Sequence, residues 1–386
     1  MERVSIIGAG AMGSGIAQVA ASYGHEVILY DYVPEALHRA ELKLAKIFGR
    51  LIEKNRMSSV QAIEIKQRII YSNKLESIEK SDLIIEAVVE NIEIKKNLFS
   101  CMETMVSESC ILASNTSSLS ITSIAGACKI PDRVIGIHFF NPVPLMPLVE
   151  IIPAIQSSEI FIEKGKNLIE SWNKITVLAK DTPGFIVNRI ARPFYGEAIR
   201  ILEEGWANIA TIDWAIKEVG GFRMGPFELM DYIGNDVNYV VTETVFKEFF
   251  FDPRYKPSFS QKRLIEANRL GRKSGHGFYN YKEKELNPVP TINQELATKI
   301  VNRVVCLLIN EAIDALFLNI ASEKDIDIAM TKGVNYPKGL LAWANEKGLT
   351  NVLAELEELF NTYGEDRYRP SPLLKKMAQE KKQFFS

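Results

Sequence analysis

One histidine and one glutamate lie in apolar runs, where an uncompensated polar side chain is costly. His138 is followed by Phe139, and Glu150 lies within Leu148–Ile152. We expect a buried partner for Glu150, and His138 is the candidate. A histidine held by a carboxylate can act as a general base, because the ordinary pKa of histidine, about 6.5, lies near neutral pH. From these residues alone, a core histidine beside an unrelated strand acid is an equally good interpretation.

A third polar segment, Asn115-Thr116-Ser117-Ser118, also follows an apolar run. If these runs are strands of an open parallel sheet, ligands bind beyond their carboxyl ends. We therefore expect Ser117 and His138 to lie at the same edge of such a sheet.

A glycine-rich segment suggests what else binds there. Gly8-Ala9-Gly10-Ala11-Met12-Gly13 is a G-x-G-x-x-G that follows an apolar run and opens a helical stretch. In this context Gly8 permits the tight turn, and Gly10 lets the backbone approach a pyrophosphate. Gly13 lets the helix pack against the strand, so that the first amides of the helix face the phosphates. The motif predicts a dinucleotide site; a purely structural glycine turn is the alternative.

The second apolar run ends at Asp31, which lies 31 − 13 = 18 residues beyond the last glycine. A carboxylate there can accept hydrogen bonds from an adenosine ribose and would repel a 2′-phosphate. We therefore expect NAD as the cofactor, with a solvated loop acid as the alternative for Asp31.

The elements that must hold these residues are short β-type runs alternating with helical stretches. This alternation predicts parallel strands joined by crossover helices, an α/β doubly wound domain of the Rossmann type over residues 1–182. The expected strands are Arg3–Ile7, Glu26–Tyr30, Asp82–Ala87, Cys110–Ala113, Arg133–Phe139 and Leu148–Ile152.

The pattern changes after Asp181-Thr182-Pro183-Gly184, and the rest of the chain has helical spacing. An offset of 114 residues relates Val187-Asn188-Arg189 to Val301-Asn302-Arg303, and Glu197-Ala198-Ile199 to Glu311-Ala312-Ile313. We therefore expect an all-α domain over 183–281, a polar linker over Lys282–Pro290, and a degenerate repeat of the domain over 291–386.

Several segments together resemble the 3-hydroxyacyl-CoA dehydrogenase family, including the shorter 3-hydroxybutyryl-CoA dehydrogenases. They are GAGAMGSGIAQ, IIEAVVENIEIKKNLF, SNTSSLSITSIA, GIHFFNPVPLMPLVEII, DTPGFIVNRI, MGPFELMDYIG and GRKSGHGFYNY. NRIARPFYGEAIR and GGFRMGPFELMD resemble the longer bacterial members of phenylacetate breakdown, which also carry a duplicated helical domain. The resemblance implies helical domains like the C-terminal domain of 6-phosphogluconate dehydrogenase.

The resemblance also implies the role of each site residue. It implies that the chain oxidises an (S)-3-hydroxyacyl-CoA to a 3-oxoacyl-CoA with NAD, with His138 as general base and Glu150 as its orienting partner. Ser117 and Asn188 match groups that hydrogen-bond the substrate oxygen. The matches to NAD contacts, beside the glycine turn and Asp31, are Glu90, Lys95, Asn141 and Lys273. Arg50 and Lys54 match basic residues near the CoA phosphates, although a helix could equally carry them as solvated charges.

The repeat bears on Asn188. Asn302 repeats it in a copy that has no nucleotide domain of its own, and Arg189, Arg303, Glu197 and Glu311 recur in the same way. We expect structural roles for the two arginines and two glutamates, while the family match favours a functional role for Asn188. The second copy should cover the first as an internal pseudo-dimer. A monomer with one site is therefore favoured, and a homo-oligomer stays open.

Composition excludes several other classes. A formal net charge of −2 gives no footprint for nucleic acid, and no apolar run is long enough to span a membrane. The four cysteines are scattered, which fits reduced thiols in the cytoplasm, and no cluster has metal-ligand spacing. Two alternatives remain: another Rossmann β-hydroxy-acid dehydrogenase, which would use a lysine or cysteine instead, and a non-catalytic NAD-binding relative.

Overall fold

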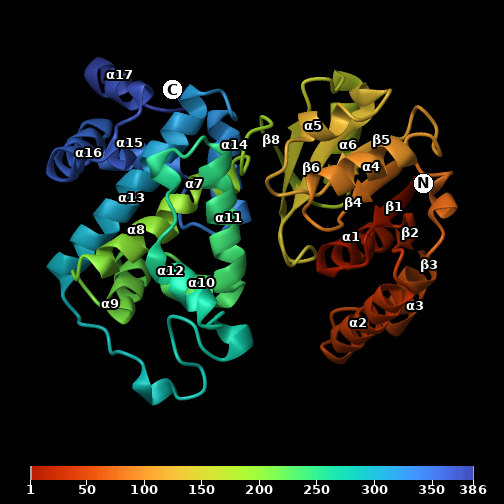
Figure 1. Cartoon of the computed structure of the whole chain (residues 1–386), viewed down its shortest axis with the longest axis horizontal. Coiled ribbons are helices and arrows are strands. Elements are labelled where there is room, and N and C mark those ends of the chain that lie inside the picture. Colours follow the sequence, from red (N-terminus) through yellow and green to blue (C-terminus); the bar gives the residue numbers. More distant parts are fainter. Residues whose placement is uncertain (1, 386) are drawn as a thin grey trace. The chain divides into compact units, whose positions relative to one another are not determined.

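The computed structural model describes residues 2–385, which form two compact units that divide between Asp181 and Thr182 (Figure 1). We call them the sheet unit and the helical unit. The division falls at the segment where the sequence pattern changes. The first residue of the expected 1–182 domain and the last residue of the expected 291–386 repeat lie outside the described residues.

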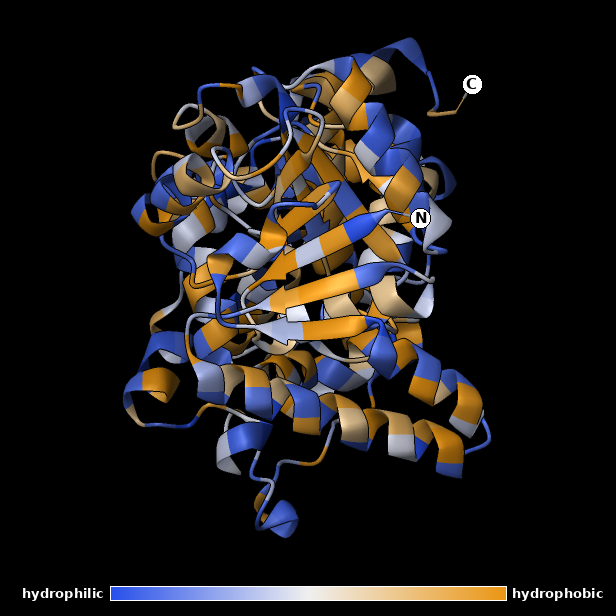
Figure 2. Cartoon of the chain, turned by 90° about the vertical axis from the view of Figure 1, so that its right-hand side faces the viewer, coloured by the Kyte–Doolittle hydropathy of each residue, from blue (hydrophilic) through white to orange (hydrophobic). Residues whose placement is uncertain are grey.

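The sheet unit is built on one eight-stranded sheet with the order β3-β2-β1-β4-β5-β6-β7-β8. Strand β1 pairs in parallel with both β2 and β4, so the strand order reverses beside it. The strands are β1 Arg3–Ile7, β2 Glu26–Tyr30, β3 Ile69–Ser72, β4 Leu83–Glu86, β5 Ile111–Ser114, β6 Val134–Phe139, β7 Leu148–Pro153 and β8 Ile175–Leu178. Their residues are mostly hydrophobic (Figure 2).

The sheet differs from the sequence prediction in two ways. Strands β3 and β8 were not predicted; each has four residues and lies at an edge of the sheet, where the hydrophobic pattern is weakest. The expectation of parallel pairing throughout is wrong for β7, which runs antiparallel to β6. The connection between them, residues 140–147, is shorter than the dozen or so residues that a parallel crossover needs.

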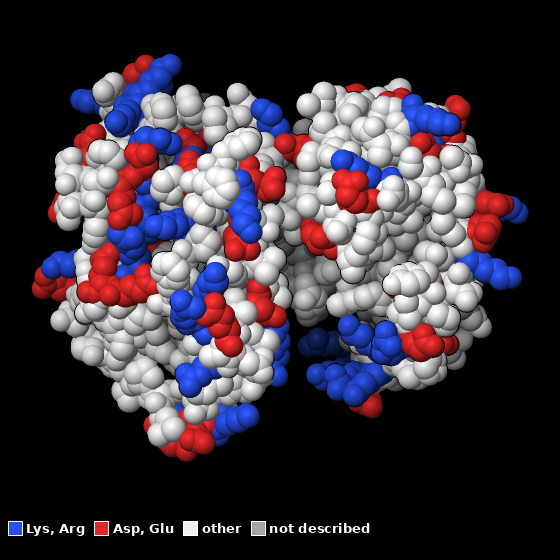
Figure 3. Space-filling model, viewed as in Figure 1, with Lys and Arg blue, Asp and Glu red and all other residues white. Residues whose placement is uncertain are grey.

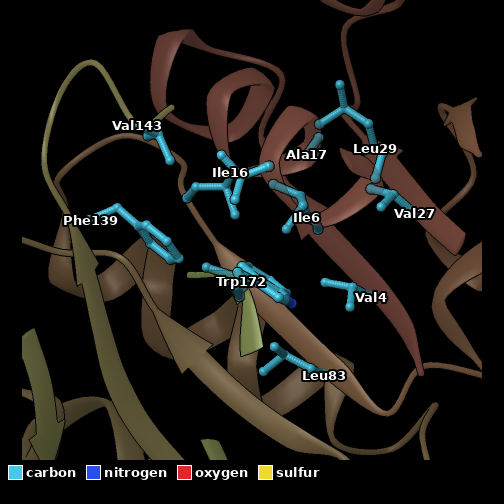
Figure 4. Packing of buried hydrophobic residues seen from close by; sticks show 14 of the residues in the cluster. Val4, Ile6, Ile16, Ala17, Val27, Leu29, Leu83, Phe139, Val143 and Trp172 are labelled. Carbon is cyan, nitrogen blue, oxygen red and sulfur yellow. The ribbon is translucent and has the colours of Figure 1, made fainter. Parts of the chain in front are cut away.

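The helices of the sheet unit cover both faces of the sheet, as expected. Alternate residues of β1, Val4 and Ile6, pack with α1, α2, α3 and α6 in one buried cluster (Figure 4). Trp172, at the end of α6, closes this cluster and stacks near Phe139, with 6.2 Å between the ring centroids. The buried residues of α4 and α5 lie outside this cluster. The helices are α1 Ala11–Ser22, α2 Pro34–Glu53, α3 Ser59–Gln67, α4 Ile92–Met102, α5 Ile121–Ala125 and α6 Glu159–Ser171, with short 3₁₀ turns at Leu75–Ile78 and Pro131–Arg133.

The helical unit contains two similar runs of helices. The first is α7 Val187–Ile190, α8 Arg192–Glu203, α9 Ile209–Trp214, the π-helix Ala215–Val219, α10 Pro226–Ile233, α11 Asn235–Glu248, the 3₁₀ turn Pro253–Tyr255 and α12 Phe259–Glu266. The second is α13 Gln294–Phe317, α14 Glu323–Gly333, α15 Leu340–Lys347, α16 Leu349–Tyr363, the 3₁₀ turn Asp366–Tyr368 and α17 Pro372–Glu380. Two 3₁₀ turns, Arg272–Ser274 and Lys284–Leu286, lie between the runs.

The two runs share capping interactions at the offset seen in the sequence. Asp213 accepts hydrogen bonds from the amides of Phe227 and Glu228 at the start of α10. Asp327 accepts the equivalent bonds at the start of α15, from Leu341 and Ala342. The repeated sequence therefore folds into repeated local structure.

The two copies are joined by reciprocal ion pairs. Arg189 donates from Nε to Oε1 of Glu311 at 2.6 Å, and Arg303 donates from Nε to Oε1 of Glu197 at 2.5 Å. All four side chains are at most 2% exposed. Each arginine pairs with the glutamate of the other copy, as two identical residues do across a two-fold axis. This confirms the structural role expected for these four residues.

Two further features were anticipated from composition. The four cysteines are free. Within residues 2–385, no helix combines the length and the apolar character needed to cross a membrane.

Candidate active site

The glycine turn after β1 has the geometry that its motif predicts. Gly8 adopts a φ of +105°, and a Cβ there would lie 2.7 Å from the carbonyl oxygen of Ala87. A Cβ on Gly13 would lie 1.8 Å from the carbonyl oxygen of Gly8, so only glycine allows α1 to approach β1 this closely. A Cβ on Gly10, in contrast, would meet no protein atom within 4 Å. The surface above Gly10 is open.

The start of α1 is suited to an anion. Gly10 is its N-cap and has no capping side chain, and in its first turn Ala11 is exposed and Met12 is half-buried. The amides of a first turn and the helix dipole favour a phosphate. Because Gly10 leaves the approach open, these residues fit a dinucleotide.

Asp31 follows β2 and is part of this turn, not a solvated loop acid. Its Oδ2 accepts a hydrogen bond from the amide of Ala9 at 2.8 Å, and its Oδ1 accepts one from the amide of Val33 at 3.0 Å. A carboxylate has about four acceptor positions, so acceptor capacity remains for a ribose hydroxyl.

A buried carboxylate network lies at the carboxyl ends of the neighbouring strands β4 and β5. Glu86, at the end of β4, is fully buried and accepts hydrogen bonds from Lys95 Nζ at 2.6 Å and from Ser114 Oγ at 2.7 Å. Lys95 is 1% exposed and also lies 3.3 Å from Oε2 of Glu90. The structure places Lys95 as the buried support of Glu90, and its expected direct contact with NAD stays a prediction.

Glu90 in turn organises the loop that carries Ser117. Its Oε1 accepts hydrogen bonds from Thr116 Oγ1 at 2.5 Å, from the amide of Ser117 at 3.2 Å and from Ser118 Oγ at 3.2 Å. Asn115 links this loop to the end of β6, because its Oδ1 accepts from the amide of Phe139 at 2.8 Å. Ser117 is therefore fixed at the carboxyl edge, beside the strand of His138.

His138 and Glu150 face each other across the antiparallel pair β6–β7. His138 Nδ1 and Glu150 Oε2 are 2.7 Å apart; the histidine is 5% exposed and the glutamate is fully buried. A neutral imidazole that donates from Nδ1 to the carboxylate presents Nε2 as the basic nitrogen. The expected His138–Glu150 pair is thus formed. Glu150 lies on β7, the strand whose direction was not predicted correctly from the sequence pattern.

The loop after β6 carries Asn141, which is exposed and joined to Pro142 by a cis peptide bond. Lys174, just before β8, holds this loop by donating to the carbonyl oxygens of Val143 at 2.6 Å and Met146 at 2.8 Å. Lys174 is 8% exposed, and burial lowers its pKa to about 8.

Sequence reasoning missed Glu86, Asn115 and Lys174 as supports of the site. Glu86 could have been noticed, since it is an acid at the end of an apolar run, as Glu150 is. Asp181 was also missed; it accepts from the amides of Ile121 and Thr122 and so caps α5. Nothing in the local sequence of Lys174 or Asp181 indicates a partner, because their partners are mainly backbone groups remote in the chain.

Two expected site residues belong to the helical unit. Asn188 lies in α7 and is half-buried, and its carbonyl oxygen accepts from Arg192 Nε at 2.7 Å. Lys273 is half-exposed and pairs with Asp236 at 2.6 Å. Asn302, the repeat of Asn188, accepts a hydrogen bond from Lys347 Nζ at 2.8 Å.

The expected CoA-binding residues lie at the end of α2. Arg50 is in its last turn and Lys54 is its C-cap, and both are exposed. They continue a row of exposed cations on one face of the helix, at Arg39, Lys43 and Lys46. Figure 3 shows blue side chains gathered over α2. A row of this kind suits a phosphate-bearing ligand.

The match to known proteins covers both units. Residues 3–182 match the NAD-binding domain of 3-hydroxyacyl-CoA dehydrogenases, and residues 184–281 and 300–383 match the C-terminal domain. The chain belongs to the 3-hydroxyacyl-CoA dehydrogenase family. The family uses a cofactor of the NAD type, and the two matched C-terminal segments correspond to the two helical copies.

Some relatives match nearly the whole chain, and others match about three quarters of it. The chain is 36% identical to a 3-hydroxyadipyl-CoA dehydrogenase of Escherichia coli K12, over 98% of each chain. It is 40% identical to human mitochondrial hydroxyacyl-coenzyme A dehydrogenase, over 73% of this chain and 92% of the relative. The crystal structure of a 3-hydroxybutyryl-CoA dehydrogenase from Escherichia coli K12 matches with a TM-score of 0.92 at 36% identity, over 98% of each chain.

Residues 2–385 contain no group of three or more His, Cys, Asp or Glu side chains that could hold a metal ion.

Proposed function

We propose that the chain carries out the reaction of its family at the carboxyl edge of the sheet. In this reaction an (S)-3-hydroxyacyl-CoA and the corresponding 3-oxoacyl-CoA are interconverted. The observation that carries the proposal is the His138–Glu150 pair, which lies at the same sheet edge as an open glycine turn. Bound NAD would supply the hydride acceptor.

The proton is handled by the protein. His138 Nε2 takes it from the 3-hydroxyl as the carbonyl forms and returns it in the reverse direction, and a positioned base of this kind contributes about 10²–10⁴-fold. Glu150 holds the ring in one orientation and stabilises the imidazolium. Ser117 and Asn188 hydrogen-bond the substrate oxygen, whose charge changes during the reaction.

NAD rather than NADP fits the turn. The carboxylate of Asp31 is fixed by the amides of Ala9 and Val33, so it cannot turn away from a 2′-phosphate without losing both bonds. Glu90, Asn141 and Lys273 are proposed as further NAD contacts, and Lys95 as the support of Glu90.

The acyl-CoA would be bound through its phosphates by Arg50 and Lys54. The curated relative that matches over 98% of this chain is named for the 3-hydroxyadipyl thioester, and the solved structure that matches over 98% is named for the 3-hydroxybutyryl thioester. We therefore propose a short acyl chain, either 3-hydroxybutyryl or 3-hydroxyadipyl.

We also propose three domains, over 1–182, 183–281 and 291–386, with one active site per chain. Asn302 is engaged by Lys347, and the second copy has no sheet unit of its own. Because the reciprocal ion pairs join the two copies inside one chain, a monomer is the favoured state.

The test is the fall of absorbance at 340 nm when the purified chain meets acetoacetyl-CoA, with NADH or with NADPH. We expect rapid oxidation of NADH and poor use of NADPH. Turnover of a small β-hydroxy acid without CoA, or NADH binding without turnover of any thioester, would overturn the proposal.

A further inference from the structure

Arg192, the first residue of α8, is a buried cation without an acid. It is 6% exposed, and no carboxylate oxygen of residues 2–385 lies within 4.0 Å of its nitrogens; the groups that act on its charge are the phenols of Tyr195 and Tyr336. It donates from Nε to the carbonyl oxygen of Asn188 at 2.7 Å and from Nη1 to Thr242 Oγ1 at 3.0 Å. Burial without a counter-ion lowers the pKa of Arg192.

The other two buried arginines of the helical unit are compensated. Arg189 pairs with Glu311 and Asp314, and Arg303 pairs with Glu197 and Glu204. Removing a guanidinium from water costs several kcal/mol unless such partners offset it. Arg192 has only neutral partners, and its charge stays uncompensated.

Arg133 of the sheet unit also has only neutral hydrogen-bond partners, the carbonyl oxygens of Ser107 and Glu103. However, it lies at the amino end of β6, and ligands of such sheets bind at the carboxyl end. Arg192, in contrast, contacts the backbone of an expected site residue, Asn188.

The groups around Arg192 lack acceptors too. The hydroxyl of Tyr336 is buried and makes no hydrogen bond to any of the described residues. Nη2 of Arg192 makes none within residues 2–385 and is not among the fully buried atoms, so it meets accessible space. The ring of Tyr195 lies 5.0 Å from the guanidinium carbon. A carboxylate would supply acceptors to Nη2 of Arg192 and to the hydroxyl of Tyr336, and an unmet buried donor such as this hydroxyl is costly.

Comparison of the two helical copies indicates that Arg192 is not one of the structural residues that they share. Structural residues recur in the second copy, as Arg189 and Glu197 do, whereas the position of Arg192 is taken by Cys306. In that copy the thiol of Cys306 lies 3.3 Å from Glu355, and Asn302 is engaged by Lys347. The uncompensated cation is therefore found only in the copy that carries Asn188.

We propose that Arg192, together with Tyr336 and Tyr195, binds the terminal carboxylate of a dicarboxylyl thioester substrate. Asn188 and Arg192 are four residues apart on nearly continuous helical backbone, a rise of about 6 Å. The three carbons beyond the reacting carbon of a six-carbon diacid can span such a step. The inference rests on the proposed function, because it assigns the far end of the substrate whose oxygen Asn188 contacts.

The test compares 3-hydroxyadipyl-CoA with 3-hydroxyhexanoyl-CoA, which has the same chain length and no terminal carboxylate. The full chain should prefer the adipyl thioester. Arg192→Met should lower kcat/KM for the adipyl thioester by about 10–100-fold, the loss of a charge-assisted hydrogen bond, and change the hexanoyl value only a few-fold. Tyr336→Phe should lower the adipyl value alone, by about 3–10-fold.

Glu355→Gln, which alters the same region of the second copy, is the matched control and should leave the ratio of the two substrates unchanged. If Arg192→Met does not fold, Tyr336→Phe alone tests the inference, through the ratio of kcat/KM for the adipyl and hexanoyl thioesters. An equal loss for both substrates in either variant, or no preference in the unaltered chain, would overturn the inference. Failure to turn over either thioester would instead overturn the proposed function.

Discussion

Arg189 in α7 pairs with Glu311 in α13, at 2.6 Å between Nε and Oε1, and the same contact recurs with the partners exchanged between Arg303 and Glu197. One duplicated segment thus covers the other through the contacts that would join two identical subunits. Because the pairs are buried, each one stabilises the contact between the copies only if both of its charged residues are present.

The first prediction follows from that burial. Arg189→Met should lower the free energy of unfolding by up to about 3–5 kcal/mol, because the buried Glu311 loses its nearest cation and keeps only Arg254, whose Nη1 lies 3.5 Å from its Oε2. Lys217→Met is the control, since Lys217 is about a third exposed and its pair with Glu228, inside the first copy, should contribute no more than about 1 kcal/mol. Urea unfolding followed by circular dichroism measures both. Similar, small losses in the two variants would show that the reciprocal pairs do not hold the copies together.

Two glycines of the same motif should respond differently to alanine. In Gly13→Ala the new Cβ would lie 1.8 Å from the carbonyl oxygen of Gly8, so α1 must move, and stability should fall by about 1–3 kcal/mol. In Gly10→Ala the Cβ meets no protein atom within 4 Å, so stability should be nearly unchanged while NADH binds at least about tenfold more weakly. Thermal unfolding and NADH fluorescence titration separate the effects. Unimpaired NADH binding by Gly10→Ala would argue against a pyrophosphate at this turn.

A third prediction concerns the dyad. His138→Gln should lower kcat for acetoacetyl-CoA reduction by at least about 10²-fold, because the positioned base is lost, and leave NADH binding nearly intact. Glu150→Gln should also be strongly impaired, because the ring loses its orientation. Near-normal turnover of His138→Gln would remove His138 from the catalytic role.

Much of this site could be predicted because its parts are local in sequence. The turn Gly8–Gly13 and its helix form a contiguous motif, and the strand containing His138 was predicted within one residue of its observed start. The direction of β7 could not be obtained from strand pattern alone. Loop length was the available signal, and the connection over 140–147 is too short for a crossover.

Contacts remote in sequence were harder to predict. The His138–Glu150 pair was suggested because a buried carboxylate needs a partner, an argument that also applies to Glu86 and Lys95. Lys174 gave no such signal, because its partners are carbonyl oxygens. The ion pairs between the copies were accessible only through the repeat, which showed that the same residues recur where no chemistry is expected.

The fourth prediction uses the lowered pKa of Lys174. Burial lowers it to about 8 in the folded chain, from about 10.4 when unfolded. Between these values the unfolded chain binds more protons, so this residue makes the free energy of unfolding rise with pH, by at most about 1.4 kcal/mol per pH unit. Lys174→Met lacks the group, and its stability deficit relative to the unaltered chain should grow from pH 7.5 to pH 9.5. Chemical unfolding at several pH values measures this, and a deficit independent of pH would contradict it.

The last prediction concerns the second helical copy. α13 buries most of its length, including Ile300, Val304 and Leu308, and it makes extensive contact with α8. Removing residues 291–386 should therefore expose a large apolar face on the first copy and cause dimerisation, aggregation or loss of stability. In the full chain, the linker gives the second copy an effective concentration of order mM, so pairing inside the chain should prevail over pairing between chains. Light scattering should then report a monomer, and NADH titration one site per chain. Two NADH per chain would contradict the single site, and a full-length dimer paired through residues 184–280 would contradict the internal pseudo-dimer.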